Sequence, residues 1–183
     1  MKEIVQEGAE VLREVAAPVE ESAFGSEELA KLVADMTDAL EAEPDGVALA
    51  APQVGVSERV FIVRMDRVDV PLLPEGEEAP AAPRPALVDV YVNPEIVKTS
   101  RRRQTADEGC LSVRGIYGTT HRHERVTLRA RREDGSRFER GAGGLLAQIF
   151  EHEVDHLNGV LFIDAAEDLV EVRPHELAHE SAA

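Results

Sequence analysis

The sequence predicts an α+β fold, and three observations lead to that prediction. A helical pattern of apolar residues lies in the N-terminal quarter, short strand-like runs follow it, and a second helical pattern lies near the C-terminus. Because the strands do not alternate with helices, a doubly wound parallel sheet is not expected. The length of 183 residues suits one domain with a short tail. The composition is 43% hydrophobic but only 4% aromatic, so the core must rest on aliphatic side chains.

The first third of the chain predicts two helical segments. Glu10 to Val15 can form a short helical turn that ends near Pro18. Ser26 to Glu43 predicts a longer helix, because Ser26 is a favoured N-cap and apolar residues follow it at helical spacing. Those residues are Leu29, Leu32, Val33, Met36 and Leu40. Pro44-Asp45-Gly46 is a turn sequence that ends this helix.

The middle of the chain predicts short strands joined by turns. Strand-like runs lie at 60–65, 86–92, 95–99, 126–132 and 137–139. Asn93-Pro94 is expected to form a turn or bend between the second and third runs, and Glu133 to Ser136 a hairpin turn. The proline-rich, acidic segment Pro71 to Pro85 is expected to be a surface loop or flap.

The late helix is the most informative element. It is predicted over Leu145 to Leu157, after the glycine-rich Gly141 to Gly144, and Asn158-Gly159 ends it. An apolar stripe at spacings of 4, 3 and 4 runs through Leu145, Ile149, His152 and His156. Residues beyond about Asp168 are polar, so we expect a catalytic domain over residues 1–168 and an exposed tail over 169–183.

The composition also restricts the partners and the compartment. A net charge of −16 argues against direct binding of nucleic acid. No run approaches the ~18 apolar residues that a membrane span needs, and the N-terminus lacks the apolar core of a secretory signal. Cys110 is the single cysteine, so no intrachain disulfide can form, as is usual in a reducing compartment. We expect a cytoplasmic protein with no membrane partner.

A metal-binding pattern lies on the late helix. His152-Glu153-Val154-Asp155-His156 has the form H-E-x-x-H, in which two histidines one turn apart can converge on one ion. The glutamate between them can act as a general base on water. A second copy, His175 to His179, lies in the polar tail and is interpreted as an accident of composition. Core histidines that have hydrogen-bond partners and no metal are the alternative interpretation.

A catalytic metal usually has three protein ligands and an open position. Cys110, the remaining histidines and several carboxylates are candidates for the third ligand. Cys110 follows Gly109, which allows close backbone approach, and a thiolate is a strong soft ligand. Metal binding would explain the single cysteine, although a lone cysteine is more often a small buried apolar residue.

Three segments together resemble the peptide deformylases. Gly46 to Gln53 is similar to the first motif of that family, G-x-G-x-A-A-x-Q, and Glu108 to Ser112 matches the second, E-G-C-L-S, without change. His152 to His156 corresponds to the third, and Asn93 to Ile96 resembles the strand before the second motif. The three motifs occur in the family's order, and the likeness runs from about Leu12 to Asp164.

The resemblance implies antiparallel sheets around a C-terminal metal-binding helix. It implies a hydrolase that removes the N-formyl group from the methionine at the start of new polypeptides, with release of formate. Cys110, His152 and His156 would bind Fe²⁺, which Zn²⁺, Ni²⁺ or Co²⁺ can replace. Glu153 would be the general base. The Gln53 side chain and the Leu111 backbone N–H would donate hydrogen bonds to the developing oxyanion.

The substrate pocket is predicted less directly. Gly46 and Val47 could pair with an extended N-formylmethionyl peptide as an added strand does. Val47, Leu145, Gln148 and Ile149 are the candidates to line the methionine pocket. Leu145 and Ile149 could equally be ordinary core residues, and a polar Gln148 would be unusual in a pocket for a thioether.

Three positions depart from the family pattern and keep alternatives open. Ala48 replaces a glycine, Glu151 replaces the usual glutamine, and Arg114 replaces a proline. These changes favour, as the alternative function, a deformylase-like paralogue that binds or hydrolyses another formylated ligand. A second alternative, another zinc amidase, would lack the intact second motif. We also consider a transient contact with the ribosome, and the sequence leaves the oligomeric state open.

Overall fold

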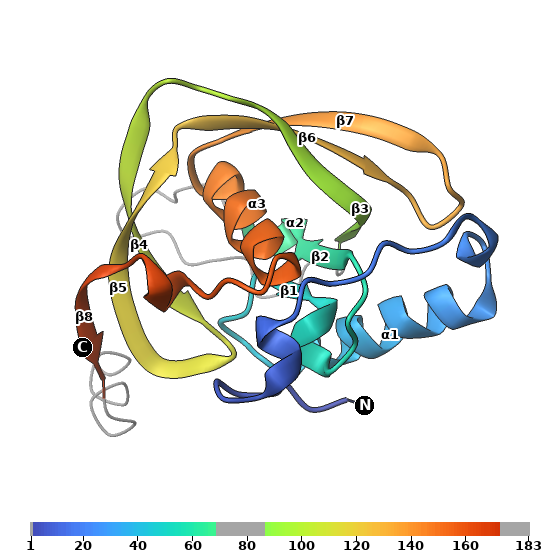
Figure 1. Cartoon of the computed structure of the whole chain (residues 1–183), viewed down its shortest axis with the longest axis horizontal. Helices are drawn as coiled ribbons and strands as arrows, with labels where there is room; N and C mark the ends of the chain where they lie inside the picture. The colour runs from blue at the N-terminus through green and yellow to red at the C-terminus, as the bar shows by residue number, and fades with distance from the viewer. Residues whose placement is uncertain (1, 69–86, 173–183) are drawn as a thin grey trace, which may run out of the picture.

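A computed structural model describes residues 2–68 and 87–172 and shows two antiparallel sheets (Figure 1). One sheet has the order β1-β2-β3-β6-β7 and the other β4-β5-β8, which confirms the α+β prediction. The strands are β1 Ala48–Ala50, β2 Val60–Arg64, β3 Val88–Thr99, β4 Arg103–Cys110, β5 Val113–His123, β6 Arg125–Arg131, β7 Arg137–Gly143 and β8 Glu167–Glu171. The α-helices are α1 Glu27–Glu41, α2 Met65–Val68 and α3 Gly144–Leu157, and the 3₁₀ helices are η1 Glu10–Arg13, η2 Glu21–Ala23, η3 Ala51–Val54 and η4 Phe162–Asp164. None of the helices in the described ranges is long and apolar enough to cross a membrane.

The five-stranded sheet has a helix on each face. All five residues of β2 are buried, which explains why its sequence is continuously apolar before Arg64. Val60 and Ile62 belong to the apolar cluster beneath α1. Phe61 and Val63 belong to the cluster beneath α3. Figure 1 shows α3 between this sheet, whose β3, β6 and β7 cover one side, and the hairpin of β4 and β5.

Helix α1 begins as the sequence predicts. The Ser26 hydroxyl accepts a hydrogen bond from the Leu29 N–H at 3.2 Å, which satisfies one of the free N–H groups of the first turn. The helix ends at Glu41, two residues before the predicted end. Its buried face contains the predicted apolar residues Leu29, Leu32, Val33, Met36 and Leu40.

Helix α3 packs on the sheet through a stripe that includes Ile149 of the predicted stripe but not Leu145. Ala147, Phe150 and Leu157 are fully buried against the sheet, whereas Leu145 is 49% exposed. Phe150 meets the ring of Tyr91 edge-on, with 5.1 Å between the ring centroids, and Tyr91 stacks on Phe61. The chain has few aromatic residues, and three of them, Phe61, Tyr91 and Phe150, pack together where this helix meets the sheet.

The C-terminal end of α3 is held by a cation. Arg59 donates hydrogen bonds to the Leu157 carbonyl at 3.1 Å and to the Asn158 side chain at 3.0 Å. The helix ends at Asn158-Gly159 as predicted, and Gly159 has a φ of +74°. A Cβ at Gly159 would lie 2.6 Å from the Arg13 carbonyl oxygen, so only glycine fits there.

The predicted turn at Asn93-Pro94 is wrong. The chain continues through these residues as one strand, β3, with a register shift between Val92 and Glu95 against β6. Asn93 has a φ of 49°, and its side chain exchanges two hydrogen bonds with the backbone of Val19. The turn residues therefore form a β-bulge inside a long strand rather than a connection between two strands.

Four strands were absent from the prediction: β1, β4, β5 and β8. β4 and β5 form a long hairpin, and β8 pairs with β5 through Ile116↔Glu171 and Tyr117↔Val170. β8 crosses the predicted domain boundary at 168 and places residues 169–171 in a sheet. The hairpin of β6 and β7 agrees with the prediction. The predicted loop over 71–85 and the tail copy of the histidine motif lie outside the described residues.

Arg59 yields a stability prediction. Arg59→Met removes the cation and both hydrogen bonds at the end of α3 but keeps an apolar stem, so the free energy of unfolding should fall by about 1.5–3 kcal/mol. Urea denaturation of the metal-loaded protein measures the change. Arg101→Met is the matched control, because Arg101 is exposed and its side chain makes no hydrogen bond within the described ranges. An equal effect of the two substitutions would contradict the capping role of Arg59.

Candidate metal centre

Three side chains converge between α3 and the hairpin of β4 and β5. Cys110 ends β4, and His152 and His156 lie one turn apart on α3. One potential ligand atom from each residue lies within 4.8 Å of the others, and the Cys110 sulfur is 3.2 Å from His156 Nε2. The structure therefore brings together the three residues that the sequence predicts as metal ligands.

The backbone around Cys110 aims its sulfur at the helix. The register of β4 and β5 shifts between Gly109 and Cys110, which turns the chain out of the regular ladder. A Cβ at Gly109 would lie 2.7 Å from the Tyr117 ring, so the ring lies directly on the glycine backbone. The sulfur accepts hydrogen bonds from the Ser112 N–H at 3.4 Å and from Gln53 Nε2 at 3.5 Å. These contacts hold the sulfur in place at the end of β4.

His152 is oriented by a buried carboxylate. Its Nδ1 lies 3.0 Å from Glu108 Oε2, which leaves Nε2 as the nitrogen for a metal. Glu108 is held in turn by Arg122, whose Nε and Nη2 donate to its two oxygens at 2.6 and 2.9 Å. Arg122 also donates to Asp155 at 2.7 Å. Burial alone would raise the pKa of Glu108, but the hydrogen bonds from Arg122 and His152 lower it to about 2.

Sequence reasoning missed Arg122 and left the role of Asp155 open. Arg122 lies in β5, a strand that the sequence did not predict, so its orientation towards the site could not be inferred. The usable signal was Glu108 itself, because a carboxylate inside an apolar motif requires a cation or hydrogen-bond donors. Asp155 serves as the second acceptor of Arg122 and ties the helix to β5.

The pKa values of the two histidines are shifted in opposite directions. Burial, and then the charge of His152, lower the pKa of His156 well below its usual value, so His156 is neutral. Burial also opposes charge on His152, but its hydrogen bonds to Cys110 and Glu108 raise its pKa well above the usual value. One sulfur and two imidazole nitrogens that lie within 4.8 Å of one another form a donor set that fits a divalent cation.

Glu153 is a buried carboxyl group without a hydrogen-bond partner at one oxygen. Glu153 is 3% exposed, and its Oε2 atom has no hydrogen-bond partner among the described residues. Burial, which disfavours the charged form, raises the pKa of Glu153 to about 7. A group with this pKa can both accept and return a proton near neutral pH.

Gln53 and Leu111 lie next to Cys110 at the cluster. The Gln53 carbonyl oxygen accepts from the Ala50 N–H at 2.9 Å, and its amide nitrogen donates to Ser112 Oγ at 3.2 Å. These contacts fix the amide so that its N–H groups face Cys110. Leu111 follows Cys110 in the turn between β4 and β5 and lines the same cavity.

A cavity of about 650 Å³ opens next to the cluster. The predicted site residues that line it are Gly46, Val47, Gln53, Cys110, Leu111, Leu145, Gln148, Ile149, His152 and Glu153. Sequence reasoning did not predict Glu43, Asp45, Ile116 and Tyr117, which line it as well. The wall therefore combines apolar side chains with a substantial share of polar and acidic groups.

Two of the predicted wall residues have a structural role as well. Ile149 is 5% exposed and belongs to the core beneath α3, so the core and pocket interpretations both apply to it. The Gln148 side chain donates to the Asp107 carbonyl at 2.9 Å, so its polar end is directed to β4. The methylene groups of Gln148 are then what the side chain offers to an apolar ligand.

The three departures from the family motifs leave the cluster intact. Glu151 contacts His123, accepting from its backbone N–H at 2.7 Å, and so adds a link between α3 and β5. Ala48 is 8% exposed in β1, opposite Val63. Arg114 forms an ion pair with Glu43 at 2.6 Å on the cavity rim. None of them displaces a ligand or fills the cavity.

The comparisons of sequence and of structure with known proteins all lead to the same family. The family model described as polypeptide deformylase matches residues 1–171. A peptide deformylase of Carboxydothermus hydrogenoformans is 38% identical over 167 residues, which cover 91% of this chain and 94% of that protein. The peptide deformylase of Thermotoga maritima has a similar solved structure, with a TM-score of 0.75 and 34% identity over 91% of this chain and 98% of that one. A class I type b peptide deformylase from Acinetobacter baumannii, bound to Met-Ala-Ser, gives 0.74 and 35% identity over 88% and 96%.

The ion pair of Arg122 and Glu108 yields a second prediction. Arg122→Met would leave a buried carboxylate without its cation, so the free energy of unfolding should fall by about 3–5 kcal/mol. Arg129→Met, which removes an exposed pair with Glu139, is the control and should cost less than about 1 kcal/mol. Thermal or urea unfolding measures both. Similar losses in the two variants would show that the Arg122 network carries no special share of the stability.

Proposed function

This chain belongs to the peptide deformylase family, and from that membership we infer that it hydrolyses the N-formyl group of N-formylmethionine at the start of new polypeptides. It is a metal-dependent hydrolase that acts on a linear amide bond and releases formate. The observation that carries this function is the convergence of Cys110, His152 and His156 beside Glu153 at a peptide-sized cavity.

We propose that Cys110, His152 and His156 hold one divalent metal. Fe²⁺ is the proposed native ion, and Zn²⁺, Ni²⁺ or Co²⁺ can replace it, because imidazole nitrogens accept all four and a thiolate strengthens the site. A cation held there supplies Lewis acidity, which polarises a carbonyl group and makes water easier to deprotonate. The Glu108 carboxylate keeps His152 in the orientation that points Nε2 to the ion.

Glu153 is proposed as the general base and then the general acid. Its buried oxygen has no other partner among the described residues, and its pKa of about 7 suits transfer in both directions. Glu153 takes a proton from the attacking water while the water oxygen bonds to the formyl carbon. When the C–N bond breaks, Glu153 returns the proton to the nitrogen, so the peptide leaves as a neutral amine.

The formyl oxygen becomes negatively charged during attack and needs hydrogen-bond donors. We propose the Gln53 amide and the Leu111 backbone N–H for this role. The support is that Gln53 is held on both sides, by Ala50 and Ser112, with its N–H groups directed to Cys110. Removal of one such donor typically reduces the rate by about 10²–10³.

The substrate is proposed to enter along β1. Gly46 and Val47 can pair with the peptide backbone, and Val47, Leu145, Gln148 and Ile149 can surround the methionine side chain. The relative from Acinetobacter baumannii holds Met-Ala-Ser, which supports a short peptide in this cavity. Arg67 donates to the Gly46 carbonyl at 2.5 Å and so stabilises the loop before β1.

The setting of this reaction is also a proposal. We place the enzyme in the cytoplasm, in N-terminal processing during protein biosynthesis, with residues 1–168 as the catalytic domain and a transient contact with the ribosome. The proposed chemistry fits N-terminal processing, because its substrate is the formylated start of a newly made polypeptide.

Glu153 provides the experiment that tests the function. Glu153→Gln should keep the metal, because Glu153 is not a proposed ligand, yet lower kcat by about 10²–10⁴-fold through loss of proton transfer. Formate release from formyl-Met-Ala-Ser and metal content by atomic emission are measured together. The control is His175→Ala with His179→Ala, which should leave both readouts unchanged.

Two outcomes would contradict the proposed function. Near-normal kcat in Glu153→Gln would remove Glu153 from its role. Hydrolysis of acetyl-Met-Ala-Ser at a rate similar to that of the formyl peptide would indicate a general amidase instead.

A further inference from the structure

The positive charge of this acidic chain is concentrated at one place. Five cationic residues lie where β3, β4 and β6 meet: Lys98, Arg101, Arg102, Arg103 and Arg125, here called the basic corner. All five are exposed. The net charge of the whole chain is −16, so the corner is opposite in sign to the average surface.

The backbone holds the basic corner together. The Ser100 N–H donates to the Arg125 carbonyl at 2.8 Å, and the Arg125 N–H donates back to Ser100 Oγ at 3.1 Å. The Glu124 N–H donates to the Arg102 carbonyl at 3.1 Å. The turn before β4 and the start of β6 are therefore fixed side by side. Lys98 pairs with Thr127, two residues from Arg125 on the same face of β6.

None of the five cationic side chains has a hydrogen bond or an ion pair with a residue in the described ranges. Arg129 and Arg131 are ion-paired with Glu139 and Glu21, and the exposed Arg132 and Arg137, which have no ion pair among the described residues, lie at the other end of the molecule. The acidic neighbour in sequence, Glu124, is half-buried. The corner differs from these positions because it gathers five unpaired cations, whose mutual repulsion a polyanionic partner would offset.

We propose that the basic corner binds the phosphate backbone of RNA. Four of the five residues are arginines, whose planar guanidinium groups bind phosphate oxygens in pairs. A membrane is less well matched, because none of the exposed large apolar residues of the described ranges belongs to the corner and membrane association relies on apolar anchors as well as charge. The positive corner attracts a polyanion, whereas the acidic remainder of the surface repels it. The protein would therefore approach RNA with the basic corner in front.

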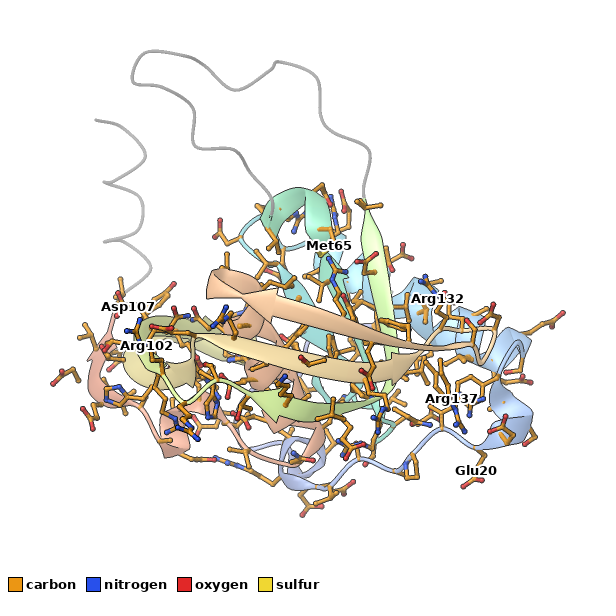
Figure 2. The ribbon with its side chains drawn as sticks, turned by 90° about the horizontal axis from the view of Figure 1, so that it is seen from above. Glu20, Met65, Arg102, Asp107, Arg132 and Arg137 are labelled. Carbon is orange, nitrogen blue, oxygen red and sulfur yellow. The ribbon has the colours of Figure 1, made fainter. Side chains whose placement is uncertain are left out.

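The position of the corner leaves the active site free. β4 begins at Arg103 in the corner and ends at Cys110 in the metal cluster, seven residues later, which is roughly 23 Å along a strand. Figure 2 shows Arg102 at the opposite end of the molecule from Arg132 and Arg137. An RNA held at the corner would therefore keep the enzyme close to a nascent polypeptide without blocking the cavity. This advantage rests on the proposed function, whereas the binding itself does not.

Fluorescence anisotropy with a short labelled single-stranded RNA tests the proposal. Arg101→Ala with Arg102→Ala removes two charges at the corner, and Arg132→Ala with Arg137→Ala removes two exposed charges at the far end as the matched control. At about 50 mM salt the corner variant should bind at least about tenfold more weakly, and the control should stay within about twofold. The slope of log K against log salt should change from about −3.5 to about −2 in the corner variant only.

The remaining outcomes separate the alternatives. Equal affinity of wild-type and corner variant, or equal losses in corner and control variants, would overturn the proposal. Binding to phosphatidylserine vesicles is measured separately by sedimentation. Binding to vesicles without binding to RNA would overturn the RNA proposal. Turnover of formyl-Met-Ala-Ser is measured in parallel and should be unchanged in both variants. RNA binding without any turnover would refute the proposed function and leave the basic corner standing.

Discussion

The polar interface between α3 and the hairpin of β4 and β5 is the contact on which the site depends. Four polar residues at helical spacing face the hairpin from α3: Gln148, Glu151, His152 and Asp155. Their partners are the Asp107 carbonyl, His123, Glu108 and Arg122. The opposite face of α3 is apolar and packs on the five-stranded sheet. One face of the helix therefore packs on apolar side chains of the sheet, and the other face forms hydrogen bonds and ion pairs with the hairpin.

That arrangement explains why the metal ligands can meet. A thiolate and two imidazoles cannot be buried without partners, because each loses hydration. The Glu108–Arg122 pair compensates part of this loss and fixes one ring, while Gln53 and Ser112 donate to the sulfur. Two buried atoms of the site residues, Glu153 Oε2 and His156 Nδ1, have no hydrogen-bond partner among the described residues. The hydrogen bonds and ion pairs around these two atoms offset the free-energy cost of burying them without a partner.

The sequence predicted the strongly periodic parts and the ligands, and failed where the pattern is weak. Helix α1 has an N-cap and a clear apolar stripe, and β2 is continuously apolar, so both were found. β4 and β5 were missed because one of their faces carries the charged network of the site, which hides the alternation of a half-buried strand. Arg122 was missed with them. Asn93-Pro94 has turn residues, but two hydrogen bonds between the Asn93 side chain and the Val19 backbone, one in each direction, accommodate them as a bulge in β3. The net charge of −16 is an average over the chain, so it could not reveal the local group of arginines at the basic corner.

X-ray absorption at the metal edge of the zinc-substituted protein tests the central claim most directly. The account predicts one sulfur at about 2.3 Å and two nitrogens at about 2.0–2.1 Å, with a lighter atom completing the shell. The sulfur signal should disappear in Cys110→Ser. A spectrum of nitrogen and oxygen neighbours alone in the wild-type protein would show that Cys110 and the histidines of α3 do not share an ion.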